Sequence, residues 1–195
     1  MADVMNLAPV VVPRRKPLLP NGVFGVMIFA ISESMFFAGL ISAFMIVRSS
    51  ATKGWPPPGQ PRLPAEQTVI NTAALIVSGV VLYGAWYLWK NQVRAARWAL
   101  LASLVLGTSF VLLQGREWVA LIGEGLTLTS SSLGSFFYLL VGLHGAHAVV
   151  ALVALGWVYA RMVRGTLERG FFLAAQVFWY FVVVLWPVIY VRMYF

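Results

Sequence analysis

Cysteine is absent from the 195-residue sequence, so disulfide bridges, thiolate metal sites and a cysteine nucleophile are excluded. Histidine is nearly absent too, since His144 and His147 are the only two. A catalytic subunit that holds haem and copper needs several histidine ligands, and two are too few. The sequence also lacks a phosphate-binding glycine loop and a dinucleotide-binding fingerprint. We therefore expect no catalytic residue, no bound metal and no cofactor in this chain.

Charged residues are scarce as well, at 10% of the sequence, whereas 61% of the residues are hydrophobic. Soluble domains carry about 25% charged residues, so this composition predicts a polytopic membrane protein. The formal net charge of +8 does not indicate nucleic-acid binding. The basic residues lie in short clusters between apolar runs, where lipid headgroups and membrane topology account for them.

Five apolar runs are each long enough to cross a bilayer, which requires about 20 residues. The predicted fold class is therefore all-α, a polytopic bundle of five transmembrane helices within residues 22–195. The predicted spans are residues 22–47, 68–89, 98–121, 133–159 and 171–190. Residues 1–21 contain four prolines and the basic triplet Arg14-Arg15-Lys16, which predicts a cytoplasmic arm on the membrane surface.

Basic residues are distributed unevenly over the segments that connect these spans. With the N-terminus inside, nine of the 14 lysines and arginines fall on the inner side and five on the outer side. Since cytoplasmic segments carry an excess of basic residues, we expect the N-terminus in the cytoplasm and the C-terminus outside.

Glu33 is the single charged residue in the first run, between Gly22 and Val47. A bare carboxylate near the centre of a bilayer costs at least ~2.5–3.5 kcal/mol, so this acid is either protonated or paired. One interpretation is a structural acid, hydrogen-bonded to a neighbouring helix, with Ser32 or Ser34 helping. The other is a proton-linked or lipid-linked site.

His144 and His147 are three residues apart and are expected on one helix face. Two histidines do not complete a metal site, which needs three or four ligands. Glu33 and Glu117 are the available additions, but nothing in the spacing requires them. We therefore interpret the imidazoles as hydrogen-bonding groups between helices, with a proton-linked role as the alternative.

Gln114 and Glu117 are also three apart, near the predicted outer interface, beside Arg116 and Trp118. Polar and aromatic residues at this depth are typical of interfacial anchors. We expect these residues to hold the span at the interface and to form an ion pair with a lipid headgroup.

Four motifs in this order resemble subunit III of the haem-copper cytochrome c oxidases, and the resemblance extends over nearly all the chain after residue 21. The motifs are Ser32-Glu33-Ser34-Met35-Phe36-Phe37-Ala38-Gly39; Trp55-Pro56-Pro57 followed by Asn71-Thr72; Gln114-Gly115-Arg116-Glu117-Trp118; and Gly134-Ser135-Phe136-Phe137-Tyr138 followed by Gly142-Leu143-His144-Gly145-Ala146-His147.

The resemblance implies an accessory subunit without redox chemistry, in an oxygen-reducing proton pump of a bacterial plasma membrane. It implies catalytic subunit I as the main partner and subunit II as a second one, with haem and copper held by those subunits. The implied role is to stabilise subunit I against turnover inactivation and to support proton uptake. Bound phospholipid and membership of a larger respiratory supercomplex are compatible with it.

Two departures from the commonest form of the family are visible. That form has seven spans, with two before the glutamate-bearing helix, so this chain is similar to the shorter five-span bacterial form. In the last span the family often has His and Asp where this chain has Tyr180 and Val183.

Two alternatives remain open on the sequence. The first is the equivalent subunit of a quinol oxidase or a nitric oxide reductase. The second is a small proton-coupled transporter that uses Glu33 and the two histidines as a relay.

Overall fold

The computed structural model describes residues 20–52 and 54–195. The cytoplasmic arm predicted at residues 1–21 lies outside the described residues except for its last two positions. The described chain forms five helices: α1 (Asn21–Ser49), α2 (Ala65–Leu88), α3 (Val93–Gly123), α4 (Ser132–Arg164) and α5 (Arg169–Tyr194).

Each of these helices is long and apolar enough to cross a membrane. No strand occurs in the described part of the chain, so the all-α prediction is confirmed. The helices extend beyond several predicted spans, since α3 begins at Val93 and α4 continues to Arg164. A helix can continue past the hydrocarbon layer because its own hydrogen bonds satisfy its backbone at any depth.

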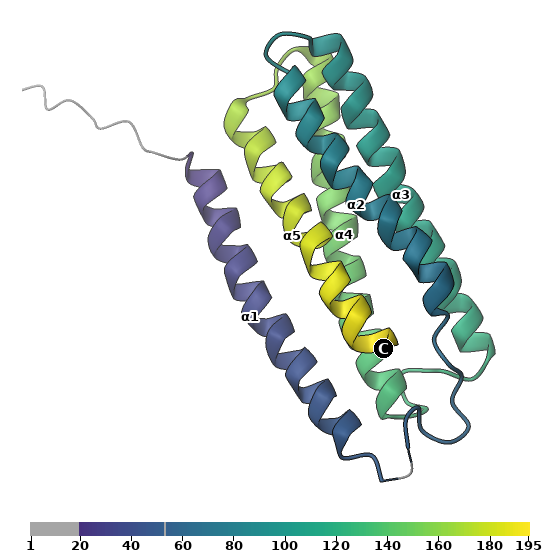
Figure 1. Ribbon diagram of the computed structural model, residues 1–195. Coiled ribbons are helices and arrows are strands. Elements are labelled where there is room, and N and C mark those ends of the chain that lie inside the picture. Colours follow the sequence, from purple (N-terminus) through teal and green to yellow (C-terminus); the bar gives the residue numbers. More distant parts are fainter. Residues whose placement is uncertain (1–19, 53) are drawn as a thin grey trace, which may run out of the picture.

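Helices α2 to α5 form a compact bundle, and α1 lies along one side of it (Figure 1). Helix α2 packs on α3 and α5, and α4 packs on α3 and α5. Helix α1 packs against α5 and, over a smaller area, against α4. Its buried residues are Val23, Phe37 and Phe44. Most of the surface of α1 is therefore open.

Helix ends and connections are specified by local chemistry. Ser131 caps the start of α4 by accepting a hydrogen bond from the Gly134 amide at 3.1 Å. Gly165 ends the same helix in the left-handed conformation, with φ of 72°, which glycine adopts without steric cost. The prolines at 56–58 prevent α1 and α2 from joining into one helix.

Small residues and hydrogen bonds bring the helices together, as is usual where lipid removes the hydrophobic driving force between them. The fully buried indole of Trp179 lies against Gly107, and its N–H donates to the Ser78 hydroxyl at 2.9 Å. The Ser103 hydroxyl donates to the carbonyl of Ser78, also at 2.9 Å. These contacts tie α2, α3 and α5 into one unit.

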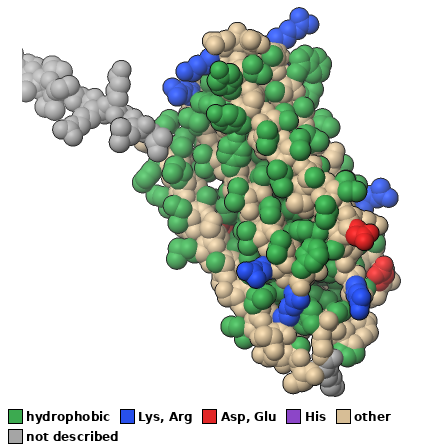
Figure 2. Space-filling model, viewed as in Figure 1, with side chains coloured by type: hydrophobic (Ala, Val, Ile, Leu, Met, Phe, Trp, Pro, Cys, Tyr) green, Lys and Arg blue, Asp and Glu red, His purple; other side chains and the backbone are tan. Residues whose placement is uncertain are grey.

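The surface agrees with a protein that spans a membrane. Figure 2 shows hydrophobic side chains over most of the visible face, with basic side chains at the upper end and basic and acidic ones in the lower part. Large apolar side chains such as Met35, Ile70 and Val153 are each about 70% exposed, at 72%, 73% and 68%. Such extensive apolar exposure fits lipid or a protein partner rather than water.

Candidate functional site

The carboxylate of Glu33 on α1 lies beside the imidazole of His147 on α4. Glu33 Oε2 is 3.3 Å from His147 Nε2, and the side chains are 25% and 12% exposed. The other ring nitrogen of His147, Nδ1, is 2.8 Å from the carbonyl oxygen of Leu143, one turn earlier. That carbonyl can only accept, so Nδ1 carries a hydrogen and Nε2 faces the carboxylate. Two titratable groups from different helices thus lie in direct polar contact.

Aromatic rings surround this pair. The ring centroids of Phe29 and Phe37 on α1 lie 5.9 and 5.8 Å from that of His147. Those of Phe178 and Phe181 on α5 lie 6.2 and 5.8 Å away. Apolar surroundings strengthen a hydrogen bond and raise the cost of an unpaired polar group. Separation of the two groups would therefore leave each polar atom unpaired among apolar rings.

Pairing answers the question of what offsets Glu33 in hydrocarbon. The ring nitrogen Nε2 of His147 is the polar group that faces the Glu33 carboxyl group from the neighbouring helix. The Ser34 hydroxyl donates to the Ala30 carbonyl at 2.7 Å, so its hydrogen is used within α1.

His144 occupies a different environment from His147, although the two are three residues apart. It is 1% exposed and lies between Trp186 and Phe110, with ring centroids at 5.1 and 6.3 Å. Neither of its ring nitrogens has a hydrogen-bond partner among the described residues. The two histidines therefore do not act as one unit, and no set of three metal-ligating side chains occurs in the described part of the chain.

A second polar cluster lies where α2, α3 and α5 meet near the end of α3. The carboxylate of Glu117 accepts from the Thr68 hydroxyl at 3.0 Å and from the phenol of Tyr194. The Gln114 side chain accepts from the Asn71 amide at 3.3 Å and donates to the Tyr194 hydroxyl at 3.4 Å. Gln114 and Glu117 thus bind neighbouring helices.

Arg116, the neighbour of Glu117 on α3, is exposed. With Glu117 and Asn71 it lines a cavity of about 450 Å³ on the α2–α3 face. The described residues contain no ion pair between Arg116 and an acidic side chain. The guanidinium is thus free for a lipid headgroup, while Glu117 is engaged inside the bundle.

Some polar contacts that join the helices involve residues that sequence reasoning did not single out. The Trp186 indole donates to the Thr72 hydroxyl at 2.8 Å. The Tyr190 phenol donates to the Ala65 carbonyl at 2.8 Å. In the sequence, such hydrogen bonds are indicated only by polar side chains inside apolar runs. Spacing along one helix does not reveal the partner on another helix.

The Arg48 guanidinium joins the end of α1 to the end of α5. It donates to the carbonyl oxygen of Arg192 at 3.4 Å and to that of Phe195. Cations at a helix C-terminus satisfy carbonyls that have no partner within the helix. This contact adds a polar link to the packing of α1 on α5.

Comparison with known proteins gives a consistent result. The model of the family described as Cytochrome c oxidase subunit III matches residues 16–195. A probable cytochrome c oxidase subunit 3 of Nocardia farcinica is 33% identical over 181 residues, covering 90% of this chain and 89% of the relative. The probable cytochrome c oxidase subunit 3 of Mycobacterium leprae is 34% identical with the same coverage.

The cytochrome c oxidase subunit 3 of Homo sapiens is 34% identical over 180 residues, covering 88% of this chain but 68% of the human protein. The bacterial relatives thus match this chain nearly end to end, as the five-span form predicts. This match and the five apolar helices confirm an integral membrane protein that associates with the other oxidase subunits. The chain belongs to the cytochrome c oxidase subunit III family and is an accessory subunit of that oxidase.

Proposed function

We propose that this chain stabilises catalytic subunit I during turnover and supports proton uptake on the cytoplasmic side, with Glu33 and His147 as the proton-linked pair. The observation that supports this role is the 3.3 Å contact between Glu33 Oε2 and His147 Nε2 inside a ring of phenylalanines. A proton can transfer along this contact without leaving the bundle.

The pair can also couple proton occupancy to helix position. Glu33 is on α1 and His147 is on α4. If the proton between Oε2 and Nε2 is lost, the lone pair of Nε2 faces the Glu33 carboxylate, and the two helices repel each other at this point. Helix α1 packs mainly on α5 and over a smaller area on α4, so among the described residues this contact is the polar link between α1 and α4. Through this link, the proton occupancy of Glu33 and His147 can affect a partner that packs on α1.

Subunit I is the partner that we place on the open face of α1. That face carries Met35 at 72% exposure and Ile31 at 61%, while Phe37 points into the bundle. An apolar face of this kind is suited to another transmembrane helix or to lipid chains. Subunit II, with the copper-bearing electron entry, and subunit I, with the haems, then hold all the redox centres.

The proposed setting is a bacterial inner membrane with the N-terminus in the cytoplasm and the C-terminus outside. In this orientation the polar cluster around Glu117 lies at the outer surface. Arg116 then reaches the headgroups of the outer leaflet, and the cavity beside it offers a site for a phospholipid.

Replacement of Glu33 by Gln in the complete oxidase complex tests this function. The amide keeps the shape and the hydrogen-bonding ability of the side chain, so we expect normal assembly. We also expect slower proton uptake or fewer turnovers before inactivation, measured during continuous oxygen consumption. Glu124→Gln is the matched control, because Glu124 is exposed beyond the end of α3. Unchanged proton uptake and lifetime in Glu33→Gln would make this residue a structural acid.

A further inference from the structure

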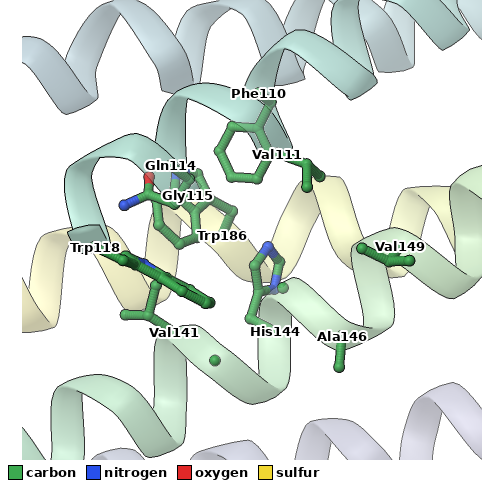
Figure 3. Close-up of a pocket in the computed structure, with 12 residues that line it drawn as sticks. Phe110, Val111, Gln114, Gly115, Trp118, Val141, His144, Ala146, Val149 and Trp186 are labelled. Atoms are coloured by element: carbon green, nitrogen blue, oxygen red, sulfur yellow. The ribbon is translucent and has the colours of Figure 1, made fainter.

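A cavity of about 230 Å³ lies between α3 and α4, on the side of α4 away from the Glu33–His147 pair. Figure 3 shows the ring of His144 rising from α4 toward Phe110, with Trp186 and Trp118 on one side and Val111 and Val149 on the other. Apart from Gln114, the other walls are apolar and largely aromatic. This composition is typical of a small-molecule site, in which few polar groups orient a mostly apolar ligand.

The mouth of the cavity opens on the surface of the bundle between α3 and α4. Gly115 on α3 leaves it open, the ring of Trp118 lies against Gly145 on α4, and Val149 at its edge is 47% exposed. A Cβ atom at Gly115 would meet no atom within 4 Å. The proposed function places subunit I on α1, which leaves this surface to lipid, so a ligand would enter from the lipid.

Two polar side chains at this cavity, His144 and Trp118, have no hydrogen-bond partner among the described residues, whereas the Gln114 amide is bonded to Asn71 and Tyr194. His144 is 1% exposed, and neither of its ring nitrogens is bonded in that part of the chain. The indole N–H of Trp118, another lining residue, is not bonded there either. A buried polar group without a partner costs about 1–3 kcal/mol, so a ligand that supplies oxygen atoms here would be favoured. Neutral imidazole offers one donor and one acceptor.

Depth in the membrane restricts which ligand can supply that oxygen. His144 lies twelve residues after Ser132, the first residue of α4. At 1.5 Å per residue this is about 18 Å from the helix end, near the middle of a hydrocarbon layer about 30 Å thick. The oxygen atoms of phospholipids and fatty acids remain at the edge of that layer. A suitable ligand must therefore carry its oxygen on a body that is soluble in hydrocarbon.

Water alone does not match the cavity. Its volume would hold several molecules, but each buried water needs two to four polar partners. The walls offer the two nitrogens of His144 and the N–H of Trp118 as unsatisfied groups. A flat ring with oxygen substituents matches better, because the aromatic walls of Phe110 and Trp186 can pack against it in edge-to-face or offset geometry.

We propose that this cavity binds the ring of a lipid-soluble quinone, with His144 hydrogen-bonded to a ring oxygen and the isoprenoid tail leaving between α3 and α4. The imidazole N–H donates to a quinone carbonyl, and the other ring nitrogen accepts from the hydroxyl of the reduced form. The interaction is binding, without electron transfer to this chain. It is independent of the proton-linked role of Glu33 and His147.

Photolabelling of the complete oxidase complex in lipid nanodiscs tests this site, with an azidoquinone as the probe. We expect label on peptides of α3 and α4 that line the cavity, and we expect decylubiquinone to compete with it. Gly115→Leu places a side chain in the mouth and should lower labelling at least tenfold. His144→Phe keeps the ring and removes both nitrogens, which should weaken competition about threefold to tenfold.

Gly156→Leu is the matched control, because Gly156 is also a helical glycine with open space at its Cβ position and does not line the cavity. It should label as the unmodified complex does. The proposal is overturned by absence of label from these peptides, by labelling that Gly115→Leu and His144→Phe both leave unchanged, or by competition from palmitic acid but not from decylubiquinone. The competition experiment on the unmodified complex decides the question even where a variant does not assemble.

Discussion

Replacement of Gly107 by Ala should loosen the junction of α2, α3 and α5. A Cβ atom at this position would lie 2.6 and 2.7 Å from two ring carbons of Trp179 and 2.9 Å from a methyl carbon of Leu152. The indole is fully buried, and its N–H is held by the Ser78 hydroxyl. The ring therefore cannot move aside without breaking that hydrogen bond.

The magnitude follows from these contacts. Overpacking of a dense core costs about 1–3 kcal/mol. A buried N–H that loses its partner adds about 1–3 kcal/mol. The better helix propensity of alanine returns about 1 kcal/mol. The expected loss in the free energy of unfolding is therefore about 1–5 kcal/mol. For a chain of this length that corresponds to a fall in Tm of roughly 2–20 °C.

Thermal unfolding of the purified complex in one detergent measures this effect. The readout is the loss of this subunit from the complex as the temperature rises. Gly156→Ala is the control, since a Cβ there meets no atom within 4 Å, and its Tm should stay level or rise slightly. Equal Tm values for Gly107→Ala and Gly156→Ala would refute the packing argument.

Two further substitutions test polar contacts between the helices. Thr72→Val keeps the side-chain shape but leaves the Trp186 N–H without its acceptor, so the free energy of unfolding should fall by about 1–3 kcal/mol. Thr72→Ser, which retains a hydroxyl, should lose less in the same thermal assay. Tyr194→Phe removes one of the donors to the Glu117 carboxylate, so the free energy of unfolding should fall by about 1.5–3 kcal/mol. An unchanged Tm would show that this contact does not stabilise the bundle.

The fold could be predicted from the sequence because bilayer thickness sets a minimum length for every span. Five runs of sufficient length, separated by basic, proline-rich or Gly/Ser/Thr-rich segments, leave little choice of architecture. The first and last residues of α3 and α4 were less predictable than the number of spans, because hydropathy marks where the hydrocarbon ends rather than where the helix ends. Ser131 and Gly165 mark the ends of α4 by capping.

The site could be predicted in part. The sequence indicates Glu33 and His147 separately as polar residues in spans, but it does not give the order or rotation of the helices. Pairing therefore appears in the structure alone. The different environments of His144 and His147 also depend on the order and rotation of the helices. Three residues in an α-helix correspond to directions about 60° apart, which on α4 is enough to place one ring against α3 and α5 and the other against α1.

A double-mutant cycle on Glu33 and His147 in the complete oxidase tests the central claim most directly. The substitutions are Glu33→Gln and His147→Asn, which retains a donor toward Leu143 but loses the nitrogen that faces Glu33. The measured quantity is the number of turnovers before inactivation, together with the rate of proton uptake. If the two residues act as one pair, the double variant should be no more impaired than the worse single variant. Strictly additive losses, or single variants that behave as the unmodified enzyme does, would contradict the claim.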